Sequence, residues 1–479
     1  MVAAAWAAYL TGLALLAVFG AHRLLLVWRA LRASGKRTVV PALPADDALP
    51  RVTVQLPLYN ERAVAARVIA AAAALDWPRD RLELQILDDS TDETRELCGA
   101  IVGALRRRGI DAHHLHRADR TGWKAGALEA GRAVASGELI AVFDADFVPP
   151  SDFLRRTVGH FADPGVGLVQ ARWGHLNRDA GLLTELQALL LDGHFAVEQA
   201  GRAAVGACFN FNGTAGIWRA RAIAAAGGWH ADTLTEDLDL SYRAALAGWR
   251  FVYAGDVVVP AELPADVLAF KSQQHRWAKG SIECARKLAP RVARAGWPWR
   301  HRLEAALHLG HNLPYLITLM VLIAGGVALA AGAGPALAMP VHVASAAVTV
   351  AVLATFVAAS QRGGGRSRLG AIARVPALIA LTAGLAVSQS RAIIEALLGR
   401  ASEFVRTPKD GATGARRERR SYRVPAGSIV FAELGLGGYL ATCAALAGSR
   451  QLWSAAAILA WLALGAIAVG VTSVVAARR

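Results

Sequence analysis

Four groups of polar side chains in the middle of the chain could do chemistry, and three of them are acidic. They are residues 88–92 (DDSTD), 144–146 (DAD) and 235–237 (TED), followed by a fourth group at 273–277 (QQHRW) in a basic segment. A run of acceptors such as the first suits a nucleobase edge, ribose hydroxyls or a metal-bound diphosphate. The four groups together therefore point to chemistry on a phosphorylated substrate.

The second group is typical of a divalent-cation site. In an extended segment residues i and i+2 point the same way, so Asp144 and Asp146 face one point. Two carboxylates so close repel each other unless a cation lies between them, and Mg²⁺ takes one or two carboxylates together with phosphate oxygens. Alone, the D-x-D pattern also occurs in many surface loops.

Each of the other groups has a purely structural interpretation as well. Residues 88–92 could form a turn and a helix cap, because Asp, Ser and Thr commonly start helices. Thr233 and Glu236 have the spacing of a capping box, and Asp237 near a helix start would offset the helix dipole. Residues 273–277 could be a juxtamembrane helix with an interfacial Trp.

The elements that must position these groups alternate between strand and helix. Strands are expected at 52–56, 82–87 and 139–143, and helices at 63–74, 93–107 and 238–247. This alternation predicts βαβ units and an α/β fold with a mainly parallel sheet, over a domain spanning residues 29–300. Ligands of such sheets bind beyond the carboxyl ends of the strands. The first two acidic groups follow directly after predicted strands.

Apolar segments flank this domain. The chain of 479 residues is 54% hydrophobic with a mean hydropathy of +0.35, and the excess lies at the N-terminus and in the last third. Residues 2–21 are uncharged and long enough to cross a bilayer, which predicts a retained transmembrane helix within residues 1–28. Two further spans are expected within 301–360 and two within 428–479.

Residues 361–427 lie between the two later pairs of helices. Their apolar run Val375–Ser390 is short and bracketed by basic loops, so we expect it to be re-entrant or interfacial, which gives five spans; a sixth ordinary span stays open. The basic residues beside the apolar segments predict an external N-terminus and a catalytic domain in the cytosol, on the cytoplasmic (inner) membrane.

The net charge of +15 does not indicate nucleic-acid binding. The basic residues gather beside apolar segments, as in cytoplasmic loops next to anionic lipid: Arg29, Arg32, Lys36, Arg37, Arg416, Arg417, Arg419 and Arg420. The four cysteines are far apart, which predicts neither a disulfide framework nor a zinc site. A lipid bilayer is therefore the expected partner, and nucleic acid is not.

In this order the four groups resemble the D, D-x-D, T-E-D and Q-x-x-R-W motifs of membrane-embedded glycosyltransferase family 2, which includes cellulose, chitin and hyaluronan synthases. The text around them is similar to plant cellulose-synthase-like mannan and glucomannan synthases and their bacterial relatives. That text comprises Gln55–Glu61 (QLPLYNE), Leu87–Thr94 (LDDSTDET), Thr121–Gly126 (TGWKAG) and Phe209–Thr214 (FNFNGT). The resemblance covers residues 50–290 densely and implies a GT-A type domain.

The resemblance also implies roles for single residues. Donor binding would fall to Leu56, Tyr59, Glu61, Asp88, Asp89, Lys124, Asp144, Gln273 and Arg276. The residues beside the acceptor sugar would be Asn212, Gly213, Thr214 and Trp277, the last as a stacking platform. Asp144 and Asp146 would hold Mg²⁺ or Mn²⁺, and Asp237 would be the general base, with Glu236 as the other catalytic carboxylate.

An inverting transfer needs a base for the attacking hydroxyl and a cation for the departing diphosphate. A helix N-terminus lowers a carboxylate's pKa and so weakens it as a base, and a dry site would have to act in the opposite direction.

The segment Phe404–Lys409 (FVRTPK) is similar to the gating loop of cellulose synthases, with Phe404, Thr407 and Lys409 matching it and Arg406 departing from it. A plain basic loop is the other interpretation.

The predicted function is therefore an inverting, metal-dependent hexosyltransferase that extends a β-linked polysaccharide, coupled to export. The donor would be UDP-glucose or GDP-mannose. The alternative is a non-processive enzyme resembling ceramide glucosyltransferase, which adds one sugar to a glycolipid acceptor. The sequence leaves the sugar, the linkage and the oligomeric state open.

Overall fold

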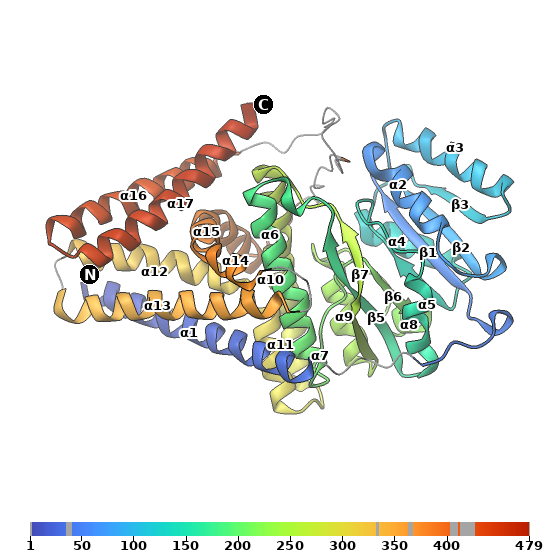
Figure 1. Ribbon diagram of the computed structural model, residues 1–479, viewed down its shortest axis with the longest axis horizontal. Helices are drawn as coiled ribbons and strands as arrows, with labels where there is room; N and C mark the ends of the chain where they lie inside the picture. The colour runs from blue at the N-terminus through green and yellow to red at the C-terminus, as the bar shows by residue number, and fades with distance from the viewer. Residues whose placement is uncertain are drawn as a thin grey trace.

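The computed structural model describes residues 2–34, 41–331, 335–362, 367–402, 411 and 427–478. A sheet domain lies on one side of the molecule and a bundle of long helices on the other, with helices α6 (Leu182–Gly193) and α10 (Val267–Arg294) between them (Figure 1). The four polar groups singled out in the sequence all lie in the sheet domain or on α10.

Seven strands form one mixed sheet in the order β3-β2-β1-β4-β6-β5-β7. Their bounds are β1 Val52–Leu58, β2 Leu82–Asp88, β3 Asp111–His116, β4 Leu139–Val142, β5 Val166–His175, β6 Gly216–Arg219 and β7 Arg250–Ala261. All neighbours pair in parallel except β6, which is antiparallel to both β4 and β5. The prediction of a mainly parallel α/β sheet is confirmed, and the predicted strands 52–56, 82–87 and 139–143 are β1, β2 and β4.

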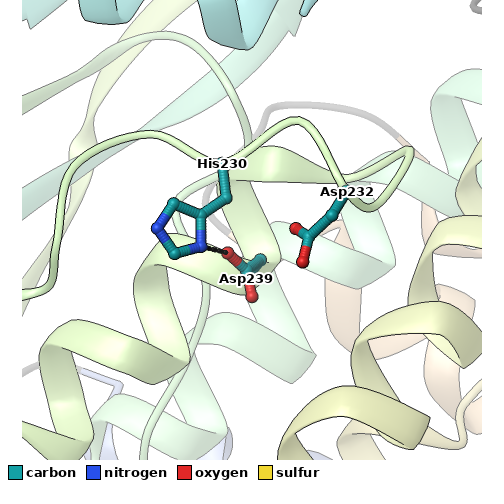
Figure 2. A group of neighbouring side chains, drawn as sticks. All are labelled: His230, Asp232 and Asp239. Carbon is teal, nitrogen blue, oxygen red and sulfur yellow. Dashed lines mark ion pairs between the residues drawn. The ribbon is translucent and has the colours of Figure 1, made fainter.

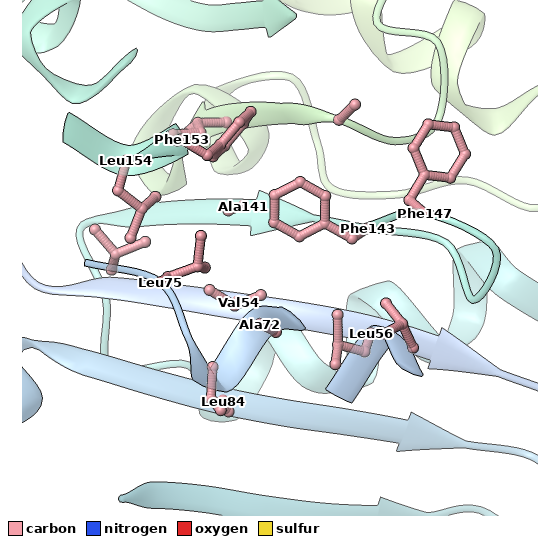
Figure 3. Close-up of a cluster of buried hydrophobic side chains, with 14 of the residues drawn as sticks. Val54, Leu56, Ala72, Leu75, Leu84, Ala141, Phe143, Phe147, Phe153 and Leu154 are labelled. Atoms are coloured by element: carbon pink, nitrogen blue, oxygen red, sulfur yellow. The ribbon is translucent and has the colours of Figure 1, made fainter. Parts of the chain in front are cut away.

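Helices cover both faces of this sheet, so its central strands are buried even at polar positions such as Gln55, Glu83 and Gln85. The helices of the domain are α2 Arg62–Ala73, α3 Thr94–Arg107, α4 Trp123–Val134, α5 Phe153–Thr157, α8 Ala220–Ala225 and α9 Glu236–Leu246. Every residue of β2 and β4 is buried, as expected for strands covered on both sides. One core contains Val54, Leu56 and Phe143 (Figure 3), and the opposite core contains Leu128 and Trp218.

Among the described residues, six helices are long and apolar enough to cross a membrane. They comprise α1 Val2–Ala33, α12 Leu313–Ala330, α13 Pro335–Ser360, α15 Val375–Leu397, α16 Ile429–Ser449 and α17 Trp453–Arg478, with the short α14 (Arg368–Ala373) leading into α15. These are the candidate spans of a multi-pass membrane protein. Their orientation stays a prediction.

The expectation that residues 375–390 are re-entrant or interfacial stays a prediction, but the segment belongs to a longer helix than the sequence indicated. It is the first part of α15, which continues to Leu397 over 23 residues, and about 20 residues suffice to span a bilayer. The apolar run ends at Ser390 because the charged residues Arg391 and Glu395 follow, and these two pair with each other at 2.7 Å within the same helix. The sixth span that the sequence left open thus has the required length.

Helix α10 joins the sheet domain to the bundle. The Lys271 ammonium contacts the Glu433 carboxylate of α16 at 2.6 Å and the Ser473 hydroxyl of α17 at 3.2 Å, and all three side chains are buried. Removing one partner of such a buried pair leaves an uncompensated charge. The position of α10, and of the Gln273, Arg276 and Trp277 side chains that it carries, is therefore tied to the membrane helices.

Candidate active site

A cavity lies beyond the carboxyl ends of β1 and β4, bounded by α4, the start of α9 and one side of α10. Most of the residues that the sequence singled out line it. They are Tyr59, Glu61, Asp89, Lys124, Asp144, Asp146, Asn212, Gly213, Glu236, Asp237, Gln273, Arg276 and Trp277. Motifs spread over more than 200 residues of sequence are thus brought into one cavity by the topology of the sheet.

Three predicted site residues, Leu56, Thr214 and Asp88, do not line the cavity. Leu56 lies in the core between the sheet and its helices, with no exposed surface, because its position in β1 directs it away from the strand end. Thr214 is fully buried, and its hydroxyl accepts a hydrogen bond from the Asp144 backbone N–H at 2.9 Å. Thr214 therefore contacts the D-x-D segment directly instead of lining the space where a sugar would lie.

Asp88 is also fully buried. Its carboxylate accepts a hydrogen bond from the Ser90 backbone N–H at 2.9 Å and lies 2.8 Å from the His114 Nε2 atom. Burial acts to raise the pKa of Asp88, but these hydrogen bonds outweigh it and hold the pKa below its ordinary value. Asp88 therefore orders the turn after β2, and Asp89 is the member of the pair that reaches the cavity.

The predicted gating residues Phe404, Thr407 and Lys409 lie outside the described residues.

Side chains at one end of the cavity hold one another in place. Arg117 makes a bidentate contact to the Asp89 carboxylate, with N–O distances of 2.8 and 2.7 Å. Arg120 lies over the Tyr59 ring, 3.4 Å from its centroid, and both side chains line the cavity. A planar guanidinium stacked on an aromatic ring provides a flat surface and a positive charge together. This arrangement suits a nucleobase joined to phosphates.

Lys124, on the first turn of α4, lies at the centre of the acidic groups. Its ammonium is 2.6 Å from Asp144, 3.8 Å from Glu236 and 2.9 Å from the Gly213 carbonyl oxygen. Burial acts to lower the pKa of Lys124, but Asp144 and Glu236 outweigh it, so the pKa is raised above its ordinary value. The lysine is therefore charged and neutralises part of the acidic cavity.

Asp237 forms no ion pair with this lysine among the described contacts. One oxygen accepts a hydrogen bond from the Leu238 backbone N–H at 2.8 Å. Burial, followed by repulsion from Glu236, raises the pKa of Asp237 to about 7. Burial also raises the pKa of Glu236. The weakening effect of the helix N-terminus is thus outweighed, and Asp237 has the basicity that a general base needs near neutral pH.

The loop before β6 comes close to Asp237 because it contains a glycine. Gly213 has a φ of +79°, and a Cβ placed there would lie 3.1 Å from an Asp237 carboxylate oxygen and 3.2 Å from the Lys124 ammonium. A larger residue would be strained in its backbone and would crowd both charged groups. The glycine therefore lets Asn212 and its neighbours approach the acidic centre.

The capping box predicted from Thr233 and Glu236 is wrong. Helix α9 begins at Glu236 itself, with Thr235 as the N-cap residue and no side-chain cap hydrogen bond. The Thr233 and Thr235 hydroxyls instead lie 3.6 and 3.4 Å from the Cys284 Sγ atom on α10. Glu236 is consequently available to the cavity.

The donor set at the end of β4 fits a divalent cation. Asp144 and Asp146 both line the cavity, Asp146 is 4% exposed, and carboxylate oxygens are the ligands that Mg²⁺ and Mn²⁺ prefer. Lys124 neutralises only one of the two carboxylates within ion-pair distance. A phosphate-bound cation would find oxygen ligands here together with open space for the phosphate.

A second acidic cluster has ligand spacing for a metal but is filled by a lysine. His230, Asp232 and Asp239 have ligand atoms within 4.8 Å of one another (Figure 2). The Lys287 ammonium lies 2.8 Å from both Asp232 and Asp239 and 3.2 Å from the His230 Nδ1 atom. Arg243 contacts Asp239 at 2.7 Å as well. Two cations thus compensate two carboxylates, and the cluster ties α9 to α10.

Sequence reasoning missed several residues that line the cavity, among them Arg120, Trp173 and Glu262. Arg120 directly precedes the segment Thr121–Gly126, so its position beside that motif was a usable signal. Trp173 lies on β5, with its ring centroid 6.5 Å from that of Trp277. Glu262 follows β7 and pairs with Arg67 at 3.2 Å. Neither of these two belongs to a motif, and only the fold brings them to the cavity.

Comparison with known proteins agrees with this geometry. Residues 50–280 match the model of the family described as glycosyltransferase like family 2. Over 263 residues the chain is 45% identical to glucomannan 4-beta-mannosyltransferase 1 of Oryza sativa subsp. japonica, a match that covers 53% of this chain and 50% of the relative. Over 250 residues it is 46% identical to glucomannan 4-beta-mannosyltransferase 2 of Arabidopsis thaliana, covering 51% and 47%. The chain thus spans about half the length of the curated relatives that it matches.

A solved structure extends the similarity of fold. A mannosyltransferase from Pyrobaculum calidifontis, in complex with GDP-Man and Mn²⁺, superimposes with a TM-score of 0.57 at 22% identity. The superposition covers 82% of this chain and the whole of that chain. The two chains therefore share a GT-A-like fold built on a mainly parallel sheet.

Proposed function

Because residues 50–280 match the model of glycosyltransferase like family 2, we propose that this protein is a hexosyltransferase that moves mannose from GDP-mannose onto a growing β-linked polysaccharide. The observation that carries the proposal is the single cavity containing the D-x-D pair, a carboxylate with a pKa of about 7 and the Gln273, Arg276 and Trp277 side chains. The choice of mannose is supported by the names of the plant relatives and by the GDP-Man bound to the solved mannosyltransferase. UDP-glucose has no such support.

The reaction would use the two sides of the cavity differently. Asp237 would take the proton from the attacking acceptor hydroxyl, which then displaces the nucleoside diphosphate with inversion at the sugar carbon. Arg276 would hold the diphosphate through its planar guanidinium, and Trp277 would support the acceptor's terminal sugar. A divalent cation held by Asp144 and Asp146 would stabilise the negative charge of the departing diphosphate.

The membrane helices would serve export of the product. We place the protein in the cytoplasmic membrane with its catalytic domain facing the cytosol, following the basic loops beside the apolar segments. The role in export is supported by the buried contact of Lys271 with Glu433 and Ser473. This contact ties α10, the helix that carries the acceptor-side Trp277, to α16 and α17. A growing chain at Trp277 would thus start next to the helix bundle.

The proposal is tested by supplying membranes that contain the full chain with radiolabelled GDP-mannose or UDP-glucose in separate reactions. We expect a labelled polymer from GDP-mannose, degraded by an endo-β-mannanase and not by a cellulase. Polymer from UDP-glucose alone would contradict the donor assignment. Label recovered only in a lipid carrying one sugar would contradict polymer synthesis and favour the single-transfer alternative.

The cation is tested in the same assay. Excess chelator should abolish transfer, and added Mn²⁺ or Mg²⁺ should restore it. Asp146→Ala should lose activity because one ligand is removed. Full activity in excess chelator would contradict the metal assignment.

A further inference from the structure

The segment between α6 and α7 (Ala200–Ala203) is a π-helical turn, His194–Gln199, that contacts the acceptor side of the cavity. Such turns are rare and are often found at functional sites. The His194 Nε2 atom lies 2.8 Å from the Asn212 Nδ2 atom, and the Gln199 Nε2 atom lies 2.6 Å from the Asn212 Oδ1 atom. Two side chains of one turn thus hold both ends of the Asn212 amide.

The hydrogen-bonding partners determine which way this amide points. Gln199 Nε2 also lies 2.8 Å from the backbone carbonyl oxygen of Asn210, which can only accept, so this atom of Gln199 must be the donor. The Asn212 atom facing it is then the accepting oxygen. The other end of the Asn212 amide is consequently the NH₂ group, which donates to His194.

The same reasoning determines the tautomer of His194. Its Nε2 atom accepts from Asn212, so the proton of the neutral ring is on Nδ1, which lies 3.1 Å from the Glu198 carboxylate. Glu198 is an acceptor because hydrogen bonding from His194 and the charges of Arg202 and Arg23 outweigh burial and lower its pKa. Hydrogen bonds therefore run from Glu198 through His194 to Asn212, and Arg23 of α1 forms an ion pair with Glu198 at 3.7 Å.

We propose that His194 is a positioning residue that fixes Asn212 as a hydrogen-bond donor toward the acceptor sugar. Asn212 lines the cavity next to Gly213, and its NH₂ group has a second N–H besides the one given to His194. That N–H selects an acceptor that presents an oxygen lone pair at this point, such as a hydroxyl or ring oxygen. This inference rests on the proposed function, since it assigns a partner to the acceptor side of the same cavity.

The test measures two quantities on the purified full chain: the affinity for GDP, and the initial rate of mannose transfer at saturating GDP-mannose. His194→Phe keeps a ring but removes the accepting nitrogen, and we expect the rate to fall about tenfold while GDP affinity stays within twofold. His194→Gln places an accepting oxygen near the former Nε2 position and should restore most of the rate. His113→Phe, on the far strand β3, is the matched control and should leave both quantities unchanged.

A double substitution separates positioning from general damage. If His194 acts through Asn212, then adding His194→Phe to Asn212→Ala should lower the rate no further than Asn212→Ala does alone. Additive losses, an unchanged rate in His194→Phe, or no rescue by His194→Gln would each overturn the proposal. If His194→Phe does not fold, the comparison of His194→Gln with Asn212→Ala still decides it. A parent protein that binds GDP but transfers no mannose would instead contradict the proposed function.

Discussion

Helix α9 carries two acidic centres that differ in how completely their charge is compensated. Asp239 is fully buried and contacts both Lys287 and Arg243, at 2.8 and 2.7 Å. Asp237, two residues earlier, lines the cavity and has no cation within ion-pair distance among the described contacts, because Lys124 contacts Asp144 and Glu236 instead. A fully paired carboxylate stabilises the fold, whereas an under-compensated one retains a raised pKa and can accept a proton.

The largest expected effect of this difference is on catalysis. Asp237→Asn keeps the shape of the side chain and its bond to the Leu238 N–H but cannot accept a proton. Transfer should fall by about 10²–10⁴-fold, with GDP affinity near that of the parent. Initial rates and GDP binding on the same preparation check this. A rate within a few-fold of the parent would remove Asp237 from the mechanism.

The same substitution at Asp239 should act on stability instead. Asp239→Asn leaves Arg243 and Lys287 without their shared buried counter-charge, which should reduce the free energy of unfolding by about 3–5 kcal/mol. Thermal unfolding of the sheet domain in the purified chain measures the loss. Transfer per folded molecule should stay close to the parent value, and a selective loss of transfer without loss of stability would contradict the comparison.

The smallest effect is expected at the rim of the second cluster. The Asp232 side chain is 58% exposed, so water screens its contact with Lys287. Asp232→Asn should change the free energy of unfolding by at most about 1 kcal/mol and leave transfer unchanged. Added Zn²⁺ or Mn²⁺ should not protect this cluster against unfolding, since Lys287 already occupies its centre. Metal-dependent stabilisation that Asp232→Asn removes would show that the cluster is a metal site.

The sequence predicts the sheet better than it predicts the membrane helices, and the reason is physical. The strands and the acids after them were predictable, because the β-branched apolar runs are covered on both faces and the acids Asp144 and Asp146 follow β4 within a few residues. The length of α15 was not, because the charged residues Arg391 and Glu395 interrupt the apolar pattern although the helix continues to Leu397.

The cavity shows the same limit at the level of single residues. The motif identifies Asp237 as a candidate base. How far a positive charge neutralises Asp237 depends on the distances from Lys124 to the surrounding carboxylates, and only the three-dimensional structure gives these distances. Trp173, Glu262 and His194 reach the site only through chain connections that no local pattern contains. Asp88 was predicted to bind the donor but instead contacts His114 away from the cavity. The sequence does not show this contact, because His114 comes from the neighbouring strand β3.

The account depends most on the raised pKa of Asp237, and the pH dependence of kcat/KM for GDP-mannose tests it directly. A base must be deprotonated to act, so a pKa of about 7 predicts a rate that is nearly full at pH 8 and about tenfold lower at pH 6. GDP affinity measured at each pH separates this from weakened donor binding, and the residual activity of Asp237→Asn should lack the acidic limb. A profile that is flat between pH 6 and 8 in the parent, with donor binding intact, would contradict the assignment of Asp237 as the base.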